Sequence, residues 1–506
     1  MVAIIHTVAL RGYTGRLIDV ETDVRTGLPG VRIVGMGNKS IDEARERVRS
    51  ALRHASLEFP ARKVTINLSP AELPKDGAHF DLPIAIGILT ASDQLRSADV
   101  SGAVYAGELA LDGRLRPIRG AILIAESAKQ NGFSKVYLPV ENVPQAQLVE
   151  GITVYGVSHL KELYQHLKGV RQLPANTDQR PLSTPVSPEA QLTLDDIQGH
   201  EHAKRALAIV AAGRHNLLLS GPPGAGKTLL AQALISLLPP LSTQEIRETT
   251  TLHSLRYGES GALLTTPPLR TPHHSTTLTA LIGGGARPQP GEVSLAHKGV
   301  LFLDEIPEFS HAALEALRTP LEDRIVHITR VHERISYPAD VLLIAAMNPC
   351  PCGYYGSQDK ACRCQASQVE RYQKKLSGPL RDRFDLQLSI KKVPFEQLVH
   401  SNTQTLSQHT EVSGAIYLAR QRQKQRYERS DVYNANATPK IIMNTFLISP
   451  EVLTFARSAA KTLQLSTRAY YRLLRVARSI ADLENKDQVL REHVAEALQF
   501  RDDSDA

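Results

Sequence analysis

Apolar and polar positions alternate in short runs along the first third of the chain. These runs cover residues 18–24, 31–34 and 64–67. A repeat of two predicts half-buried β-strands. Between the second and third run, Ser40 and Glu43 have the spacing of a capping box, which predicts a helix continuing through Leu52. The first third is therefore expected to be a mixed α/β domain.

The middle of the chain has a different pattern, in which continuous apolar runs end in glycine, acidic or amide residues. One run leads into a glycine-rich loop, VLFL leads into Asp304 and Glu305, and VLLIAAM leads into Asn348. Continuous apolar runs are typical of strands buried on both faces of a parallel sheet. Residues 324–338 instead alternate on both sides of a polar centre and predict a β-hairpin. From about residue 413 the composition is helical.

The glycine-rich loop has the sequence GPPGAGKT and fits the phosphate-binding pattern G-x-x-x-x-G-K-[ST]. Its residues are Gly221, Pro222, Pro223, Gly224, Ala225, Gly226, Lys227 and Thr228. Glycines let backbone N–H groups surround phosphate oxygens, the lysine reaches the β and γ phosphates, and the threonine hydroxyl is a magnesium ligand. A plain strand-to-helix turn is the structural alternative. We expect ATP and magnesium to bind here.

The acidic pair after the next apolar run supplies the other half of an ATPase site. Asp304 is the expected second magnesium ligand, and Glu305 is the expected general base for the attacking water. A buried strand that merely ends in two acids is the alternative.

Length and charge bound the remaining organisation. A chain of 506 residues suggests about three domains. No apolar run approaches the roughly 20 residues of a membrane span, and the start lacks the pattern of a signal peptide, so a soluble cytoplasmic protein with no membrane partner is expected. The formal charge of +7 is compatible with a nucleic-acid partner. The stretch 170–192 is rich in Pro, Ser, Thr and Gln and predicts a linker.

All four cysteines lie close together, which does not suit a disulfide framework. They are Cys350, Cys352, Cys362 and Cys364. Four thiolates on two short turns could surround a tetrahedral zinc ion. Free or redox-labile thiols are the alternative.

Several segments resemble AAA+ ATPases, and the resemblance implies roles for particular residues. Asn348 matches the first sensor, which orients water near the γ phosphate. Arg383 matches an arginine finger that enters the neighbouring subunit's site, with Arg381 as the second choice. Arg468 matches the γ-phosphate contact of the second sensor, with Arg475 as the second choice.

The order of these segments resembles the AAA+ branch with an insert in helix 2. In that branch a hairpin enters the central pore, so Arg330 and His332 at the hairpin centre are candidate DNA contacts, with a solvated hairpin tip as the alternative. The segments 270–275 and 282–285 would form the insert. A basic segment at residues 414–429 could also contact phosphate, or could be a solvated face.

The first third resembles the proteolytic domain of the Lon family at PKDGAHFD, residues 74–81, and at residues 107–120. Where Lon proteases have a serine nucleophile and a lysine base, this chain has His79 and Ile122. Neither can perform that chemistry. The resemblance implies a non-catalytic Lon-like domain.

Together with NPCPCG at residues 348–353 and SGPLRDRFD at residues 377–385, these segments closely resemble the ComM (YifB) family. The resemblance implies an α/β architecture of four parts. They are a degenerate Lon-protease-like domain at 1–168, a linker at 169–192, an AAA+ P-loop core with a helix-2 insert and the cysteines at 193–395, and a helical lid at 396–506.

The function implied by the resemblance is a hexameric, ATP-dependent branch-migration helicase that acts on branched or single-stranded DNA during natural transformation. The alternative is a magnesium-chelatase-like remodeller of a protein partner. A protease is disfavoured by His79 and Ile122, and a nucleotide-gated scaffold without turnover is disfavoured by Glu305.

Overall fold

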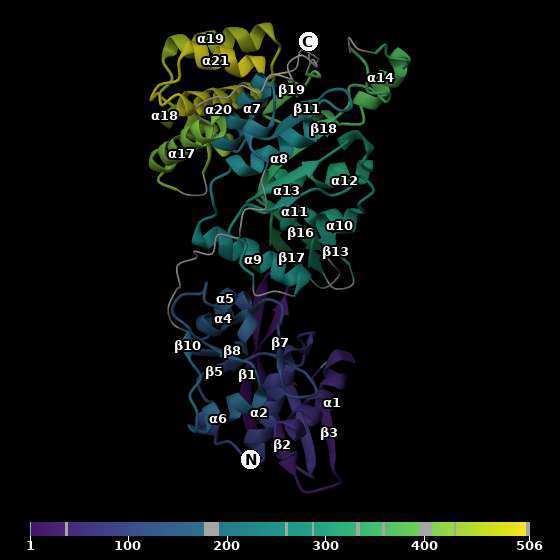
Figure 1. Ribbon diagram of the computed structural model, residues 1–506, viewed down its shortest axis with the longest axis vertical. Coiled ribbons are helices and arrows are strands. Elements are labelled where there is room, and N and C mark those ends of the chain that lie inside the picture. The colour runs from purple at the N-terminus through teal and green to yellow at the C-terminus, as the bar shows by residue number, and fades with distance from the viewer. Residues whose placement is uncertain are drawn as a thin grey trace.

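The computed structural model describes residues 2–35, 39–176, 192–258, 262–285, 288–329, 334–356, 360–393, 407–429 and 432–501. The molecule is elongated, with the N-terminal unit at one end and the C-terminal helices at the other (Figure 1). The described helices include none with both the length and the apolar character that a membrane crossing requires.

The N-terminal unit is built on an eight-stranded sheet with the order β10-β9-β8-β5-β1-β2-β4-β3. The strands are β1 Val2–Arg11, β2 Thr14–Arg25, β3 Gly30–Val34, β4 Lys63–Ser69, β5 Ala103–Tyr105, β8 Lys135–Pro139, β9 Thr153–Val157 and β10 Ala175–Asn176. β2 is antiparallel to both β1 and β4, whereas β5, β8 and β9 are parallel. The expected strands at 18–24, 31–34 and 64–67 are confirmed as β2, β3 and β4.

Helices cover this sheet, and a short hairpin lies beside it. The helical elements are α1 Lys39–His54, η1 Ala78–Phe80, α2 Asp81–Ala91, α3 Ser97–Val100, α4 Ala121–Gln130, η2 Val140–Asn142, α5 Val143–Ala146 and α6 Leu160–Leu167, and the hairpin is β6 Glu108–Leu109 with β7 Leu115–Arg116. The expected helix through Leu52 is confirmed as α1. Every residue of α2 is buried, because the helix is apolar apart from Thr90 and from Asp81, which pairs with Arg47, and it packs against β1 and β2.

The first sheet continues past the boundary expected at residue 168. β10 pairs antiparallel with β9, so residues 175 and 176 belong to the N-terminal unit. Most of the expected linker, residues 177–191, lies outside the described residues.

The central unit contains a five-stranded sheet with the order β12-β15-β18-β11-β19. The strands are β11 Leu217–Ser220, β12 Leu269–Arg270, β15 Val300–Leu303, β18 Leu342–Met347 and β19 Leu386–Ser389. All neighbouring pairs are parallel. β15 and β18 are entirely buried, as their continuous apolar sequences predict. The three functional segments therefore leave the sheet at its carboxyl edge, where ligands bind in open α/β sheets.

The other elements of the central unit are short helices and hairpins around this sheet. They are η3 Leu194–Asp196, α7 Glu201–Gly213, α8 Lys227–Leu237, α9 Thr243–Tyr257, α10 Leu278–Ile282, β13 Gly283–Gly284, β14 Gln289–Pro290, α11 Glu292–Leu295, η4 Ile306–Glu308, α12 His311–Ala316, α13 Arg318–Asp323, β16 Ile325–Thr329, β17 Arg334–Pro338, α14 Ala366–Gln373 and α15 Gly378–Arg381. The predicted hairpin is confirmed as antiparallel β16 and β17. Its centre, including Arg330 and His332, lies outside the described residues.

The C-terminal unit is helical, as its composition predicts. Its elements are α17 Gln408–Tyr427, η5 Asn434–Asn436, α18 Pro439–Thr445, α19 Pro450–Thr462, α20 Thr467–Leu483 and α21 Arg491–Gln499. α20 packs against α7, and buried residues from both units belong to one continuous apolar cluster. The boundary expected between 395 and 396 falls within residues 394–406, which are not described.

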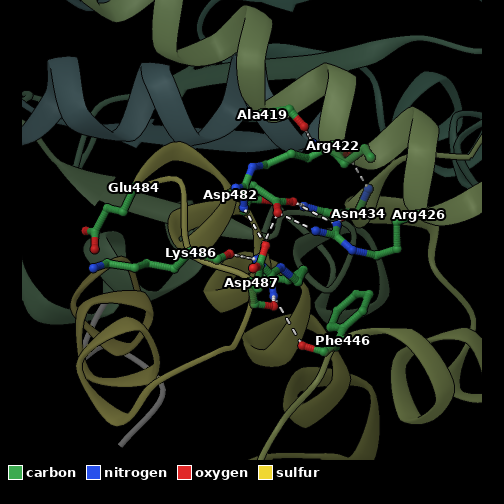
Figure 2. A network of polar contacts seen from close by, with 12 residues as sticks. Ala419, Arg422, Arg426, Asn434, Phe446, Asp482, Glu484, Lys486 and Asp487 are labelled. Atoms are coloured by element: carbon green, nitrogen blue, oxygen red, sulfur yellow. Dashed lines mark hydrogen bonds and ion pairs between the residues drawn. The ribbon is translucent and has the colours of Figure 1, made fainter.

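A buried ion network organises the C-terminal unit (Figure 2). Asp482 is almost fully buried and accepts hydrogen bonds from Arg426, Arg478 and Asn434, each at 2.9 Å. Burying an unpaired arginine would be very costly, so the carboxylate and these donors depend on one another. Arg426 belongs to the basic segment 414–429, and the network gives it a structural role.

Helix α9 joins the N-terminal and central units. Its Ile246 belongs to the same apolar cluster as Val8 and Ile118 of the N-terminal unit. Ser254 on α9 accepts a hydrogen bond from the Gly120 amide at 2.8 Å. Further along, Leu252 packs with Ile335 and Tyr337 of the hairpin strand β17. One helix thus contacts both the N-terminal unit and the base of the hairpin.

Candidate nucleotide site

The loop between β11 and α8 has the backbone that a phosphate loop requires. Gly224 and Gly226 have φ angles of +74° and +82°, which favour glycine. At Gly221 a Cβ atom would lie 2.4 Å from the Ile390 carbonyl oxygen, so only glycine fits there. Helix α8 begins at Lys227, and its N-terminal end faces the loop, where an anion is favoured.

Lys227 connects this loop to Asn348 at the end of β18. Its Nζ donates to Gly221 O at 2.7 Å, to Pro222 O at 3.0 Å and to Asn348 Oδ1 at 3.1 Å. Burial lowers the pKa of Lys227, and the carboxylates of Asp304 and Glu305 partly oppose that effect. The fold therefore brings together the expected phosphate ligand and the expected first sensor, although 121 positions separate them in the chain.

Thr228 and Asp304 form an oxygen pair suited to magnesium. The Thr228 hydroxyl donates to Asp304 Oδ2 at 3.3 Å. Hydroxyl and carboxylate oxygens are hard ligands of the kind that Mg²⁺ prefers. The two residues come from α8 and the end of β15, so the parallel sheet creates this pair.

Glu305 is held in a left-handed conformation with a φ of +50°. It lines a cavity of about 300 Å³ together with Thr228, Asp304, His273 and His274. His274 Nδ1 lies 3.6 Å from Glu305 Oε2. The sequence placed His274 only in an insert, and no local pattern could link it to Glu305, because the contact forms between two loops.

Arg383 and Arg468 lie together, but in another cavity. Both line a cavity of about 500 Å³ whose lining includes neither the phosphate loop nor Asp304, Glu305 or Asn348. The Arg383 guanidinium pairs with Glu322 at 2.5 Å, whereas Arg468 is exposed in the first turn of α20. Within one chain, the two candidate arginines are thus separated from the phosphate-binding residues.

Arg475, the alternative to Arg468, lines the same cavity. The Arg475 guanidinium is engaged within the chain, because its Nε donates to Ala437 O at 2.9 Å. Arg472 between them was missed by sequence reasoning. It donates to Phe384 O at 2.8 Å and to Asp382 Oδ1 at 3.1 Å, and so ties the segment carrying Arg383 to helix α20.

The four cysteines converge. The Sγ atom of Cys350 lies 3.4 Å from that of Cys352 and 3.7 Å from that of Cys362, and Cys352 lies 3.6 Å from Cys362. All four Sγ atoms, including that of Cys364, lie within 4.8 Å of one another, and all four thiols are free. The fold therefore gathers a potential set of four metal ligands directly after Asn348.

Both positions that would carry Lon chemistry are buried. His79 Nε2 donates to Val8 O at 3.0 Å, and burial lowers the pKa of His79 to about 4. Ile122 is completely buried in α4. These two positions hold packing residues rather than a nucleophile and its base.

Much of the basic segment is occupied internally. Arg420 donates to Ala211 O at 2.6 Å and stacks on Tyr433, and Arg422 pairs with Asp487 at 3.1 Å. Together with the pairing of Arg426, these contacts favour the structural interpretation of this segment.

Three stretches of the chain match family descriptions for magnesium chelatase. Residues 193–398 match "Magnesium chelatase, subunit ChlI", residues 20–142 match "Subunit ChlI of Mg-chelatase" and residues 407–501 match "Magnesium chelatase, subunit ChlI C-terminal". With the phosphate loop and the parallel sheet, these matches define a magnesium-chelatase-like AAA+ protein, a class that indicates an ATPase.

Similar proteins identify the family within this class. The chain is 43% identical over 501 residues to the uncharacterized protein YifB of Salmonella typhimurium, covering 99% of this chain and 97% of the relative. It is 41% identical over 504 residues to the competence protein ComM of Haemophilus influenzae, covering 99% and 97%. The chain belongs to the YifB/ComM family.

A more distant similarity concerns Lon proteases. Lon protease 2 of Bacillus subtilis is 29% identical over 208 residues, which is 37% of this chain and 36% of the relative. This partial similarity agrees with the expected Lon-like part of the fold.

Proposed function

We propose that the protein is an ATP-hydrolysing motor that works as a ring of identical subunits, a hexamer, on branched or single-stranded DNA. The main support for a ring is that Arg383 and Arg468 are separated from the phosphate loop within one chain. Two arginines that line a separate cavity can complete a nucleotide site if a neighbouring subunit presents them. Hydrolysis would then depend on assembly, as with arginine fingers supplied in trans.

In this mechanism separate residues bind the phosphates, bind magnesium, activate water and stabilise the transition state. Lys227 and the backbone of the loop bind the phosphates, while Thr228 and Asp304 hold magnesium, which neutralises developing charge. Glu305 accepts a proton from the attacking water, and Asn348 orients that water. Arg383 and Arg468 of a neighbouring subunit stabilise the charge of the transition state.

DNA as the substrate is supported by relatives and by charge. One relative is named a competence protein, and the chain carries a formal charge of +7. We assign Arg330 and His332, at the centre of the β16–β17 hairpin, as DNA contacts that pull the strand. The reaction would be branch migration of recombination intermediates during natural transformation.

Three further parts complete the proposal. The four cysteines bind one zinc ion, since their Sγ atoms all lie within 4.8 Å of one another. The Lon-like domain is non-catalytic, since His79 and Ile122 are buried. The central and C-terminal units act as ATPase core and lid.

A second function is supported by the family descriptions. The chain matches magnesium chelatase subunits in three stretches, so the same ATPase could remodel a protein partner. In that case DNA would not stimulate hydrolysis.

The deciding experiment is strand exchange on a synthetic branched DNA with ATP. Intact protein is compared with Lys227→Ala and Glu305→Gln variants, and ATP hydrolysis is measured with and without DNA. Branch migration by intact protein alone supports the DNA motor. If intact protein hydrolyses ATP but never moves branches, the DNA motor is wrong and the protein-remodelling function takes its place.

A further inference from the structure

The loop that carries the four cysteines lies against the nucleotide site. We propose that a single zinc ion, bound by these thiolates, holds Asn348 and the phosphate loop in their working positions and thereby sets the rate of ATP turnover. This inference rests on the proposed ATPase function of the same site. It assigns the metal a role in positioning residues for hydrolysis.

The sulfur geometry suits one tetrahedral ion. Zinc–sulfur bonds of about 2.3 Å in a tetrahedron place the sulfur atoms about 3.8 Å apart. Three of the observed separations are 3.4, 3.6 and 3.7 Å. Disulfides would instead join the sulfurs in pairs at about 2.05 Å. The four thiols are therefore arranged around a common centre rather than as two pairs.

Backbone groups of the loop also point at the sulfur atoms. The amide of Tyr355 donates to Cys350 Sγ at 3.3 Å, and the amide of Cys364 donates to Cys362 Sγ at 3.4 Å. Such donors stabilise thiolate charge and orient metal ligands. Cys350 is buried, and the other three cysteines are half-buried, so the set is shielded on one side and reachable on the other.

The cysteine loop touches the phosphate loop at Gly353. Its amide donates to Cys350 O at 2.9 Å, which closes a turn. A Cβ atom at Gly353 would lie 2.6 Å from Pro223 Cδ, so the two loops are packed directly together. The φ angle of Gly353 is +84°, which favours glycine independently of the contact with Pro223.

The cysteine loop and α14 hold the chain directly after Asn348. Cys350 follows Asn348 after a single proline, and Lys227 donates to the Asn348 side chain. Gln373 of α14 donates to Pro349 O at 3.1 Å, and α14 begins two residues after Cys364. Fixing the four thiolates thus fixes the chain on the carboxyl side of Asn348, directly at Cys350 and through α14 at Pro349.

The loop has little else to hold it in place. Of the described residues 351–356 and 360–364, only Gly353 is buried. Segments without apolar content fold through metal binding because the binding free energy is also folding free energy. Zinc release would therefore free Asn348 from its contact with Lys227.

The first test uses the full-length protein and three variants. Metal analysis should find one zinc per chain in intact protein and in Arg363→Ala, an exposed position between two ligands. The double variant Cys362→Ser/Cys364→Ser should lose zinc and hydrolyse ATP at least tenfold more slowly, while its affinity for ATP changes less than threefold. Gly353→Ala should keep zinc, because all four thiols remain, and still hydrolyse ATP more slowly, because it disturbs the contact with Pro223 and the backbone of the turn.

A reversible measurement covers the case in which the double variant does not fold. Zinc is removed from intact protein with phenanthroline and a thiol reductant, with magnesium supplied throughout, and is then restored. Turnover should fall and return, and amide exchange in peptides that cover residues 217–228 and 341–353 should rise at least tenfold and return.

Zinc below about a tenth of an equivalent in protein purified without chelator would show that the four cysteines do not form a zinc site. Zinc-free protein with unchanged turnover and unchanged amide exchange would overturn the positioning role. Failure of the DNA motor is a separate result, since protein that hydrolyses ATP without moving branches still reports on zinc. If no ATP is hydrolysed at all, the proposed ATPase fails, and the exchange measurement alone decides whether zinc positions the sensor.

Discussion

His274 Nδ1 lies 3.6 Å from Glu305 Oε2, and this contact joins the insert between β12 and β15 to the expected general base. Glu305 is more than half exposed at its side chain, so few other contacts fix its orientation. An imidazole that faces the carboxylate can hold it toward the attacking water.

We predict that His274→Ala lowers kcat for ATP about tenfold, a fraction of what general-base catalysis contributes, with ATP affinity unchanged. His274→Asn, which keeps a side-chain N–H, should recover part of the loss. Steady-state hydrolysis and equilibrium binding of an ATP analogue measure the two effects. An alanine variant with the intact rate would show that Glu305 is oriented without His274.

Arg383 should act across a subunit boundary. Arg383→Ala should bind ATP normally but hydrolyse it more than about a hundredfold more slowly, as expected for a missing arginine finger. Mixing this inactive variant with inactive Lys227→Ala should restore activity, because some interfaces then combine an intact phosphate loop with an intact arginine.

In randomly mixed rings about a quarter of the interfaces are restored, which sets the expected ceiling. Each variant alone, at the same total concentration, is the control. A mixture that remains as inactive as its components would mean that Arg383 does not complete a neighbour's site.

Asp482 should be among the residues on which the C-terminal unit depends most. Asp482→Asn removes the charge that compensates Arg426 and Arg478, so the free energy of unfolding should fall by about 3 kcal/mol or more. Urea unfolding followed by circular dichroism measures the change. Asp487→Asn is the matched control, because its exposed pair with Arg422 should contribute less than about 1 kcal/mol.

His79 should make the N-terminal unit sensitive to acid. Burial lowers its pKa from 6.5 to about 4, so between these values the unfolded state binds more protons, and stability falls as pH falls. Compared with His79→Gln, intact protein should lose about 3 kcal/mol more of its free energy of unfolding between pH 6.5 and pH 4.

Asp81, whose pKa burial raises to about 6, acts in the opposite direction, but both proteins contain it, so the comparison isolates His79. Parallel pH profiles for the two proteins would contradict the prediction.

Motifs with a fixed local geometry could be read from the sequence. The phosphate loop, Asp304 and Asn348 follow apolar strands, and parallel pairing brings the ends of those strands to one edge. The alternation of apolar and polar residues at 324–338 was enough to predict the hairpin. These features depend on neighbours in the chain and on a sheet rule that applies generally.

Contacts between distant loops and helices could not be read in this way. His274 approaches Glu305, and Arg472 anchors the segment of Arg383, only because the tertiary fold places their loops and helices side by side. The pattern of the basic segment gave the charge of Arg426 but not its buried partner Asp482, since charge along a helix does not reveal what the helix packs against.

Helix α9 has a consequence for dividing the chain into working pieces. Leu241, just before α9, and Ile246 within it are buried together with residues of the N-terminal unit. A protein shortened to residues 192–501 would keep every residue proposed to bind the nucleotide but would present this apolar surface to water. Truncation at the linker therefore yields an ATPase fragment prone to aggregation, unless these apolar positions are also replaced by polar ones.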